Sequence, residues 1–145
     1  MTRDPTFRRA RTCYDHLAGR LGVALADALQ DRGHVLVKER TGLVTEAGQR
    51  FLCEFGIVLL PQADRRNKGP GLCRTCLDGT EKRPHLAGRL GAALCARCFD
   101  LGWVERINGS RAVAITSAGQ DGFARTFGVW IPMVNPWGEP GAAGP

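Results

Sequence analysis

The stretch His16-Leu17-Ala18-Gly19-Arg20-Leu21-Gly22 decides the fold, because residues 85–91 repeat it without a change. The residues in front of it repeat as well. Arg11-Thr12-Cys13-Tyr14-Asp15 precedes the first stretch, and Arg74-Thr75-Cys76-Leu77-Asp78 precedes the second, with an insertion before His85. A shared heptapeptide with further matches in the same order indicates one structural unit written twice.

Each copy has the pattern of a helix, a two-stranded hairpin and a second helix. Leucines recur at every fourth residue from Leu17 to Leu29, which predicts a helix over about 16–31 with a counterpart over about 85–101. Gly33 and Gly102 are typical helix stops, and Asn108-Gly109 is typical of a hairpin turn. Thr45 and Thr116 are placed to cap the closing helices, over about 47–55 and 118–127. The sequence therefore predicts an α+β, mainly helical chain, with tandem winged-helix-like repeats that share one core.

The length of 145 residues suits one domain, or two very small domains with a common core. The repeat predicts a first unit over 1–68 and a second over 69–134, followed by a disordered Gly/Pro-rich tail over 135–145. No apolar run approaches the roughly 18–20 residues that a membrane span needs. The N-terminus also lacks an apolar signal core. We therefore expect a cytoplasmic protein without a membrane partner, whose cysteines are thiols or metal ligands.

The formal net charge of +6 leaves two interpretations of the basic residues open. They gather in short clusters, which include Arg8, Arg9, Arg11, Arg65, Arg66 and Lys68. These side chains could contact the phosphates of a nucleic acid, with a strong dependence on salt. Alternatively, they are solvated loop residues on a mildly basic protein.

Four cysteines have the spacing of a tetrathiolate metal site. Cys73 and Cys76 form one CxxC pair, Cys95 and Cys98 form another, and 18 residues separate the pairs. This spacing predicts a site for zinc or another thiophilic metal. The repeat supports a different interpretation, because Cys98 occupies the position of Leu29 in the first copy. On that interpretation the helical cysteines are small core side chains.

A second candidate site follows from the correspondence between the two copies. If the two lead helices pack about a pseudo-twofold axis, equivalent polar groups converge on an effector or a second metal site. In this correspondence Cys13, Asp15 and His16 of the first copy match Cys76, Asp78 and His85 of the second. The residues assigned to the site are Cys13, Asp15, His16, Asp78 and His85, while Cys76 is already assigned to the tetrathiolate. Alternatively, the aspartates stabilise the helix starts and the histidines bond to nearby backbone. A strip of small residues, with Gly22 and Gly91, predicts a contact between the lead helices or between subunits.

The repeated motifs quoted above, together with Arg83-Pro84 before the second heptapeptide, resemble the C-terminal region of helix-turn-helix regulators of the arsenical-resistance-repressor (ArsR) type. The resemblance covers about residues 8–130. It implies a C-terminal sensing or assembly module of a transcriptional regulator, acting as a homodimer. In that family a separate N-terminal winged helix reads the DNA, and this chain starts where that domain would end. DNA is then bound directly or through the separate domain.

The sequence fits no enzyme template. It has no phosphate-binding glycine loop, no paired carboxylates with a nearby base and no Ser/His/Asp set. We therefore predict a non-enzymatic protein. The alternative to the regulator is a zinc-stabilised structural or protein-interaction module.

Overall fold

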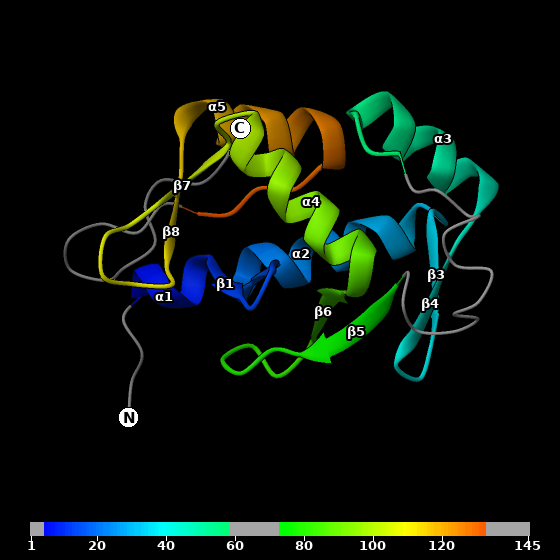
Figure 1. Cartoon of the computed structure of the whole chain (residues 1–145), viewed down its shortest axis with the longest axis horizontal. Coiled ribbons are helices and arrows are strands. Elements are labelled where there is room, and N and C mark those ends of the chain that lie inside the picture. The colour runs from blue at the N-terminus through cyan, green and yellow to red at the C-terminus, as the bar shows by residue number, and fades with distance from the viewer. Residues whose placement is uncertain (1–4, 59–72, 133–145) are drawn as a thin grey trace.

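Two similar series of elements follow each other along the chain (Figure 1). The computed structural model describes residues 5–58 and 73–132, so the predicted tail over 135–145 lies outside the described residues. The first series consists of α1 (Pro5–Arg9), β1 (Arg11–Cys13), β2 (His16–Ala18), α2 (Gly19–Asp31), β3 (Val35–Lys38), β4 (Thr41–Val44) and α3 (Glu46–Phe55). The second consists of β5 (Arg74–Leu77), β6 (Pro84–Ala87), α4 (Gly88–Asp100), β7 (Val104–Arg106), β8 (Val113–Ile115), α5 (Ser117–Gly122) and the π-helical η2 (Phe123–Phe127). The predicted α+β class and the order of helix, hairpin and helix are present in both copies.

The predicted helix starts at residues 16 and 85 are wrong. Residues 16–18 and 84–87 form strands β2 and β6, which pair with β1 and β5 in two antiparallel hairpins. The chain turns from strand to helix at Gly19 and Gly88, where φ is +76° and +73°. These are left-handed values that glycine adopts without strain. The four-residue spacing of the leucines hid this boundary, because Leu17 reaches the core from a strand.

The signals for helix ends and caps are confirmed. Thr45 and Thr116 accept hydrogen bonds from the backbone N–H groups of Gly48 and Gly119, three residues after each threonine, in the first turn of the closing helices.

The second hairpin of each copy is also present. Hairpin β7–β8 forms around the Asn108-Gly109 turn region. Strands β3, β4, β5 and β6 form one four-stranded sheet, so the second hairpin of copy one and the first of copy two are continuous.

The two copies pack crosswise around one apolar core. Helix α2 packs against β6 of the second copy, and α4 packs against β2 of the first. The small-residue strip allows close packing here, because a Cβ atom at Gly22 or Gly91 would clash with the carbonyl oxygen of Leu17 or Leu86 in the strand before its helix. The same Cβ atoms would also lie 3.4 Å from His85 Cβ or 3.1 Å from His16 Cβ of the other copy. Both glycines also line one small cavity together with Leu25 of α2 and Leu94 of α4. Both helices bury their leucine stripes in the same apolar cluster, which also contains Phe123.

Among the described residues, none of the helices combines the length and the apolar character that crossing a membrane requires.

Candidate metal centre

The two hairpins β1–β2 and β5–β6 present the same pair of side chains in the same register. Cys13 lies directly opposite His16, and Cys76 lies directly opposite His85. Directly opposed residues of an antiparallel pair project from the same face of the hairpin. The insertion in the second copy lengthens the turn between Leu77 and Pro84, so it leaves the Cys–His pair intact.

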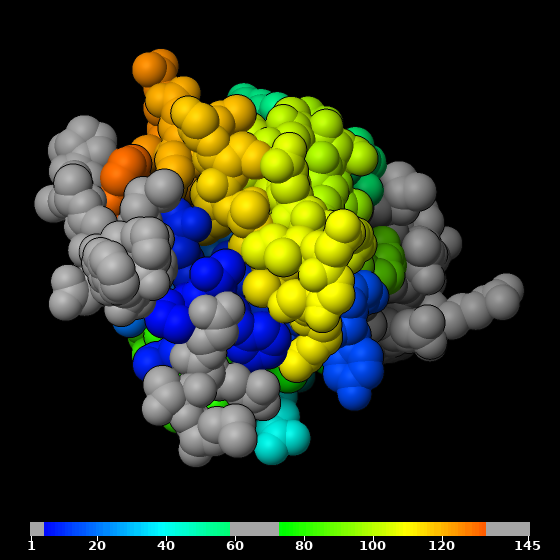
Figure 2. Space-filling view, turned by 90° about the vertical axis from the view of Figure 1, so that its left-hand side faces the viewer, coloured from blue at the N-terminus to red at the C-terminus, as the bar shows by residue number. Residues whose placement is uncertain are grey.

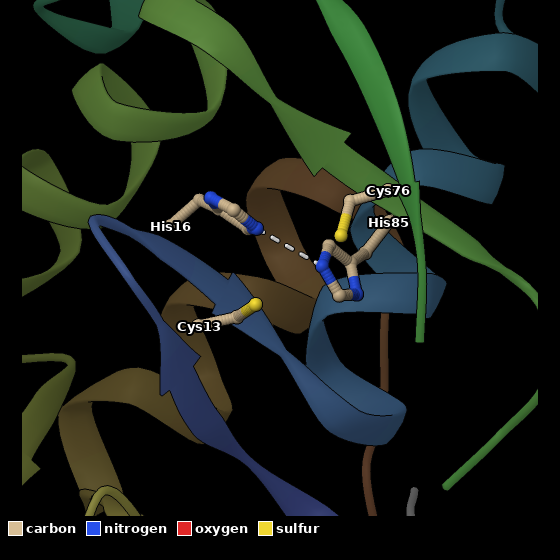
Figure 3. A group of neighbouring side chains, drawn as sticks. All are labelled: Cys13, His16, Cys76 and His85. Atoms are coloured by element: carbon tan, nitrogen blue, oxygen red, sulfur yellow. Dashed lines mark hydrogen bonds between the residues drawn. The ribbon is translucent and has the colours of Figure 1, made fainter. Parts of the chain in front are cut away.

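The crosswise packing brings these four side chains together (Figure 3). The Sγ atoms of Cys13 and Cys76 and one ring nitrogen of each histidine all lie within 4.8 Å of one another. The two Nε2 atoms of His16 and His85 are 3.0 Å apart. Both histidines are buried and both cysteines are half-buried. Two hairpins from distant parts of the sequence thus contribute equally to one cluster.

A carboxylate orients each histidine. The Nδ1 atom of His16 lies 3.3 Å from Asp15 Oδ1, and the Nδ1 atom of His85 lies 3.0 Å from Asp78 Oδ1. Because a carboxylate only accepts hydrogen bonds, each ring donates its Nδ1–H, and a neutral ring then carries a bare lone pair on Nε2. Because the two Nε2 atoms lie within hydrogen-bonding distance, they must either share a proton or have a metal ion between them. Carboxylates behind metal-binding histidines have this arrangement in many metal sites.

Asp78 is fully buried and belongs to a dense network. Besides His85, it accepts hydrogen bonds from Arg11 and from the backbone N–H groups of Gly19, Thr80 and Glu81. Burial acts to raise the pKa of this carboxyl group, but the bond from His85, the backbone donors and the Arg11 charge together hold the pKa well below its ordinary value. Asp78 is therefore a fixed anion behind His85. It also satisfies the first N–H of α2 in the other copy.

The donor set fits a thiophilic metal. Two sulfur and two nitrogen ligands are a common zinc set, and tetrahedral bonds of about 2.0–2.3 Å place the ligand atoms roughly 3.3–3.8 Å apart. A cluster within 4.8 Å reaches that size by small side-chain shifts. Burial, followed by the neighbouring Cys76 thiol, raises the pKa of Cys13, and a bound cation would reverse this effect by stabilising the thiolate.

The structure places the sequence-predicted tetrathiolate residues differently. Cys76 lies in the Cys–His cluster, whereas Cys73, Cys95 and Cys98 are buried and do not belong to it. Burial raises the pKa of Cys73 and Cys95 to about 11 and that of Cys98 to about 12. Cys98 packs in the core beside the leucines of α4, in agreement with its match to Leu29.

The structure places the five residues of the second predicted site close together. Cys13, His16 and His85 lie in the cluster, and Asp15 and Asp78 orient its rings. The alternative, in which the aspartates stabilise helix starts, also applies to Asp78, because it accepts the N–H of Gly19 at the start of α2, the helix of the other copy. Cys76, which corresponds to Cys13 in the repeat, is the fourth member of the cluster.

The predicted nucleic-acid contacts lie in varied surroundings. Arg9 is buried and donates to the carbonyl groups of Ile131 and Pro132. Arg11 is buried against Asp78. Arg8 is partly exposed, and Arg65, Arg66 and Lys68 lie outside the described residues.

Comparison with known proteins gives one informative similarity. The chain is 38% identical over 122 residues to a Bacillus subtilis (strain 168) protein named "Uncharacterized HTH-type transcriptional regulator YdfF". The alignment covers 84% of this chain and 53% of the relative, so the chain spans about half of that protein's length. No protein-family model matches the chain. No solved structure matches it either.

Proposed function

We propose that the chain is the metal-binding sensing or assembly module of a helix-turn-helix transcriptional regulator of ArsR-like type. The similarity to a protein named as an HTH-type regulator supports the transcriptional role. The Cys13–His16–Cys76–His85 cluster is the observation that carries the metal-binding part. The module has no catalytic task in this proposal. It binds a metal and passes that state to a DNA-reading domain.

DNA reading through a separate winged-helix domain is consistent with the order of elements. In the described residues, the long helices α2 and α4 are each followed by a hairpin, whereas a helix-turn-helix needs a second helix directly after a short turn. The module contributes at most general phosphate contacts through exposed basic residues. The two repeats remain winged-helix-like units in this proposal, and the regulator works as a cytoplasmic homodimer.

Zinc is the proposed metal. Its preference for tetrahedral sulfur and nitrogen ligands matches the cluster, and each hairpin would supply two of the four ligands. The bound ion would supply positive charge between the two Nε2 atoms and would fasten the two copies together. The residues of this chain supply the rest: Asp15 and Asp78 orient the rings, and the crosswise helices hold the hairpins in place.

Elemental analysis of the purified chain tests the proposal and separates the two candidate metal sites. We expect about one zinc ion per chain, lost in Cys13→Ser and in His85→Gln but retained in Cys98→Ala. A chain whose zinc depends on Cys95 and Cys98 and not on Cys13 would favour the tetrathiolate site. Folded, metal-free protein after growth with added zinc would refute metal binding.

The second candidate function is a zinc-stabilised structural or protein-interaction module. The position of the cluster at the junction of the two copies favours it, since a metal there would stabilise the fold whether or not DNA is involved. Gel-shift titrations of the full regulator on its own upstream DNA distinguish the two. An affinity for DNA that changes when zinc is chelated supports regulation, and an unchanged affinity supports the structural module.

A further inference from the structure

A basic pocket adjoins the metal centre. Its volume is about 660 Å³, which is within the usual range for small-molecule sites. The pocket lies between α1–β1, the β5–β6 turn and the segment before β8, and it shares Cys13 and His85 with the cluster. Figure 2 shows two of these parts side by side, the blue N-terminal segment and the yellow segment that leads to β8. Both copies of the repeat therefore contribute to its walls.

Every charged side chain among the residues that line this pocket is cationic. These residues are Arg8, Arg11, Lys82 and Arg111. Two acidic side chains lie near the pocket without being among the lining residues. Glu81 lies 3.8 Å from Arg8 and 3.6 Å from Arg20. Asp78 lies behind the wall and is already bound to Arg11. The pocket therefore favours an anion.

The pocket is fixed on one side and adaptable on the other. The Arg11 guanidinium is held by Asp78, Thr80 and the Phe7 carbonyl group, so it forms a rigid cationic wall. Lys82 and Arg111 are exposed and can close on a ligand. The Nε atom of Arg8 is buried without a hydrogen-bond partner among the described residues, and only the Glu81 carboxylate, 3.8 Å away, offsets its charge.

An apolar surface lies beside the cations. The Phe7 ring lies 4.6 Å from the Arg11 guanidinium carbon and 5.2 Å from that of Arg111, measured to the ring centroid. Two cations over one ring repel each other, and an anion between them would relieve this repulsion. The pocket also includes Ala18 and Leu77, of which Leu77 is two-thirds exposed, at 67%. A ligand with a compact apolar body would cover this surface.

We propose that this pocket binds a small organic anion, with a phosphate or carboxylate group on a compact apolar body, beside the metal centre. The guanidinium groups would hold the oxyanion, and Phe7 and Leu77 would cover the apolar part. The inference rests on the proposed sensing function and deepens it. The Arg11–Asp78–His85 chain of contacts connects the ligand to the metal ligands, so occupancy of one site would alter affinity at the other.

Calorimetric titration of the zinc-loaded chain tests the proposal with three probes. Phenyl phosphate carries both parts of the expected ligand, inorganic phosphate carries only the anion, and benzyl alcohol carries only the apolar ring. We expect phenyl phosphate to bind at least about tenfold more tightly than either of the others. Leu77→Ser should weaken phenyl phosphate and leave inorganic phosphate unchanged.

Matched charge variants locate the binding. Lys82→Gln with Arg111→Gln should weaken phenyl phosphate roughly ten- to hundredfold, because two charge-assisted contacts are lost. Arg50→Gln with Arg125→Gln removes two exposed charges elsewhere and should leave binding unchanged. Equal binding by both double variants, or no binding of phenyl phosphate, would overturn the proposal.

Two further measurements separate this proposal from others. Zinc content is determined for every variant. If phenyl phosphate does not bind but the chain still contains zinc, the pocket proposal is wrong and the proposed metal-binding function is unaffected. Binding of duplex DNA is titrated in parallel. If DNA binding is lost in the Lys82/Arg111 variant while phenyl phosphate does not bind to the wild type, the pocket contacts DNA phosphates and the small-ligand proposal is wrong.

Discussion

Replacing Asp78 by asparagine tests the network behind the metal centre most directly. Asp78→Asn keeps the shape of the side chain but removes its charge. Arg11 and the Nδ1–H of His85 then lose an anionic partner at a site where Asp78 and His85 are almost completely buried. The backbone N–H groups of Gly19 and Glu81 bond to different oxygens of Asp78, Oδ1 and Oδ2. In the asparagine only one of these donors keeps an oxygen acceptor, because the amide nitrogen cannot accept a hydrogen bond.

The magnitude follows from burial. Breaking a buried ion pair by removing one partner costs about 3–5 kcal/mol. The retained amide oxygen places Asp78→Asn near the lower limit, at about 3 kcal/mol. Loss of a carboxylate behind a metal-binding histidine typically lowers metal affinity about 10- to 100-fold. The matched control is Asp121→Asn, whose partner Arg125 is 80% exposed, so its cost should stay below about 0.5 kcal/mol.

Urea unfolding in the presence of a chelator measures the free energy of unfolding of the metal-free variants. Competition with a zinc indicator measures their affinity for zinc. The reasoning would be refuted if Asp78→Asn unfolded within about 0.5 kcal/mol of the control variant and bound zinc equally well.

We also expect the stability difference between the wild type and Asp78→Asn to depend on pH. The pKa of Asp78 is held below its ordinary value in the folded chain, so its stabilising effect is complete above the unfolded value of about 3.9 and is lost as the pH falls toward the folded value. In metal-free protein, the stability difference between wild type and Asp78→Asn should narrow by about 1.4 kcal/mol per pH unit below about 3.9. A constant difference between pH 5 and pH 2 would contradict this assignment.

Three smaller predictions use melting and mass spectrometry. Gly91→Ala should destabilise by about 1–3 kcal/mol, since the new Cβ would lie 2.5 Å from the Leu86 carbonyl oxygen and 3.1 Å from His16 Cβ; an unchanged melting temperature would disprove the close contact. Thr45→Ala should cost about 1 kcal/mol in the same assay, because α3 loses its N-terminal cap. Iodoacetamide at pH 8 should modify the exposed Cys53 quickly and leave Cys98 unmodified, since burial raises the pKa of Cys98 to about 12; equal labelling of the two thiols would contradict the packing of α4.

The sequence could predict the architecture because local signals and the repeat agree. Threonine caps, glycine stops and the leucine stripes each act over a few residues, and both copies carry them. The first hairpins were missed for a physical reason. Leu17 and Leu86 continue the helical spacing of four while lying in strands, and only the left-handed φ at Gly19 and Gly88 separates the two structures.

The candidate site was predictable in part. The correspondence of Cys13 with Cys76 and of His16 with His85 indicated convergence, because equivalent positions in two copies meet near a pseudo-twofold axis. The role of Asp78 was not predictable, since its partners Arg11 and Gly19 come from the other copy through tertiary packing. The CxxC spacing assigned Cys76 to a different site, the tetrathiolate with Cys73, Cys95 and Cys98. Spacing alone does not show which of these thiols are buried in the core.

The exchange of partners between α2 and α4 has a consequence for the origin of the chain. Each half on its own would expose the helix face that the other half's hairpin covers, and it would hold only two of the four ligands. A single-copy ancestor could bury that face and complete the set of four side chains only by association with an identical molecule. Duplication and fusion would then have converted an obligate pair of molecules into one polypeptide, and freed each half to diverge, as the buried Asp78 and the exposed Asp15 have done.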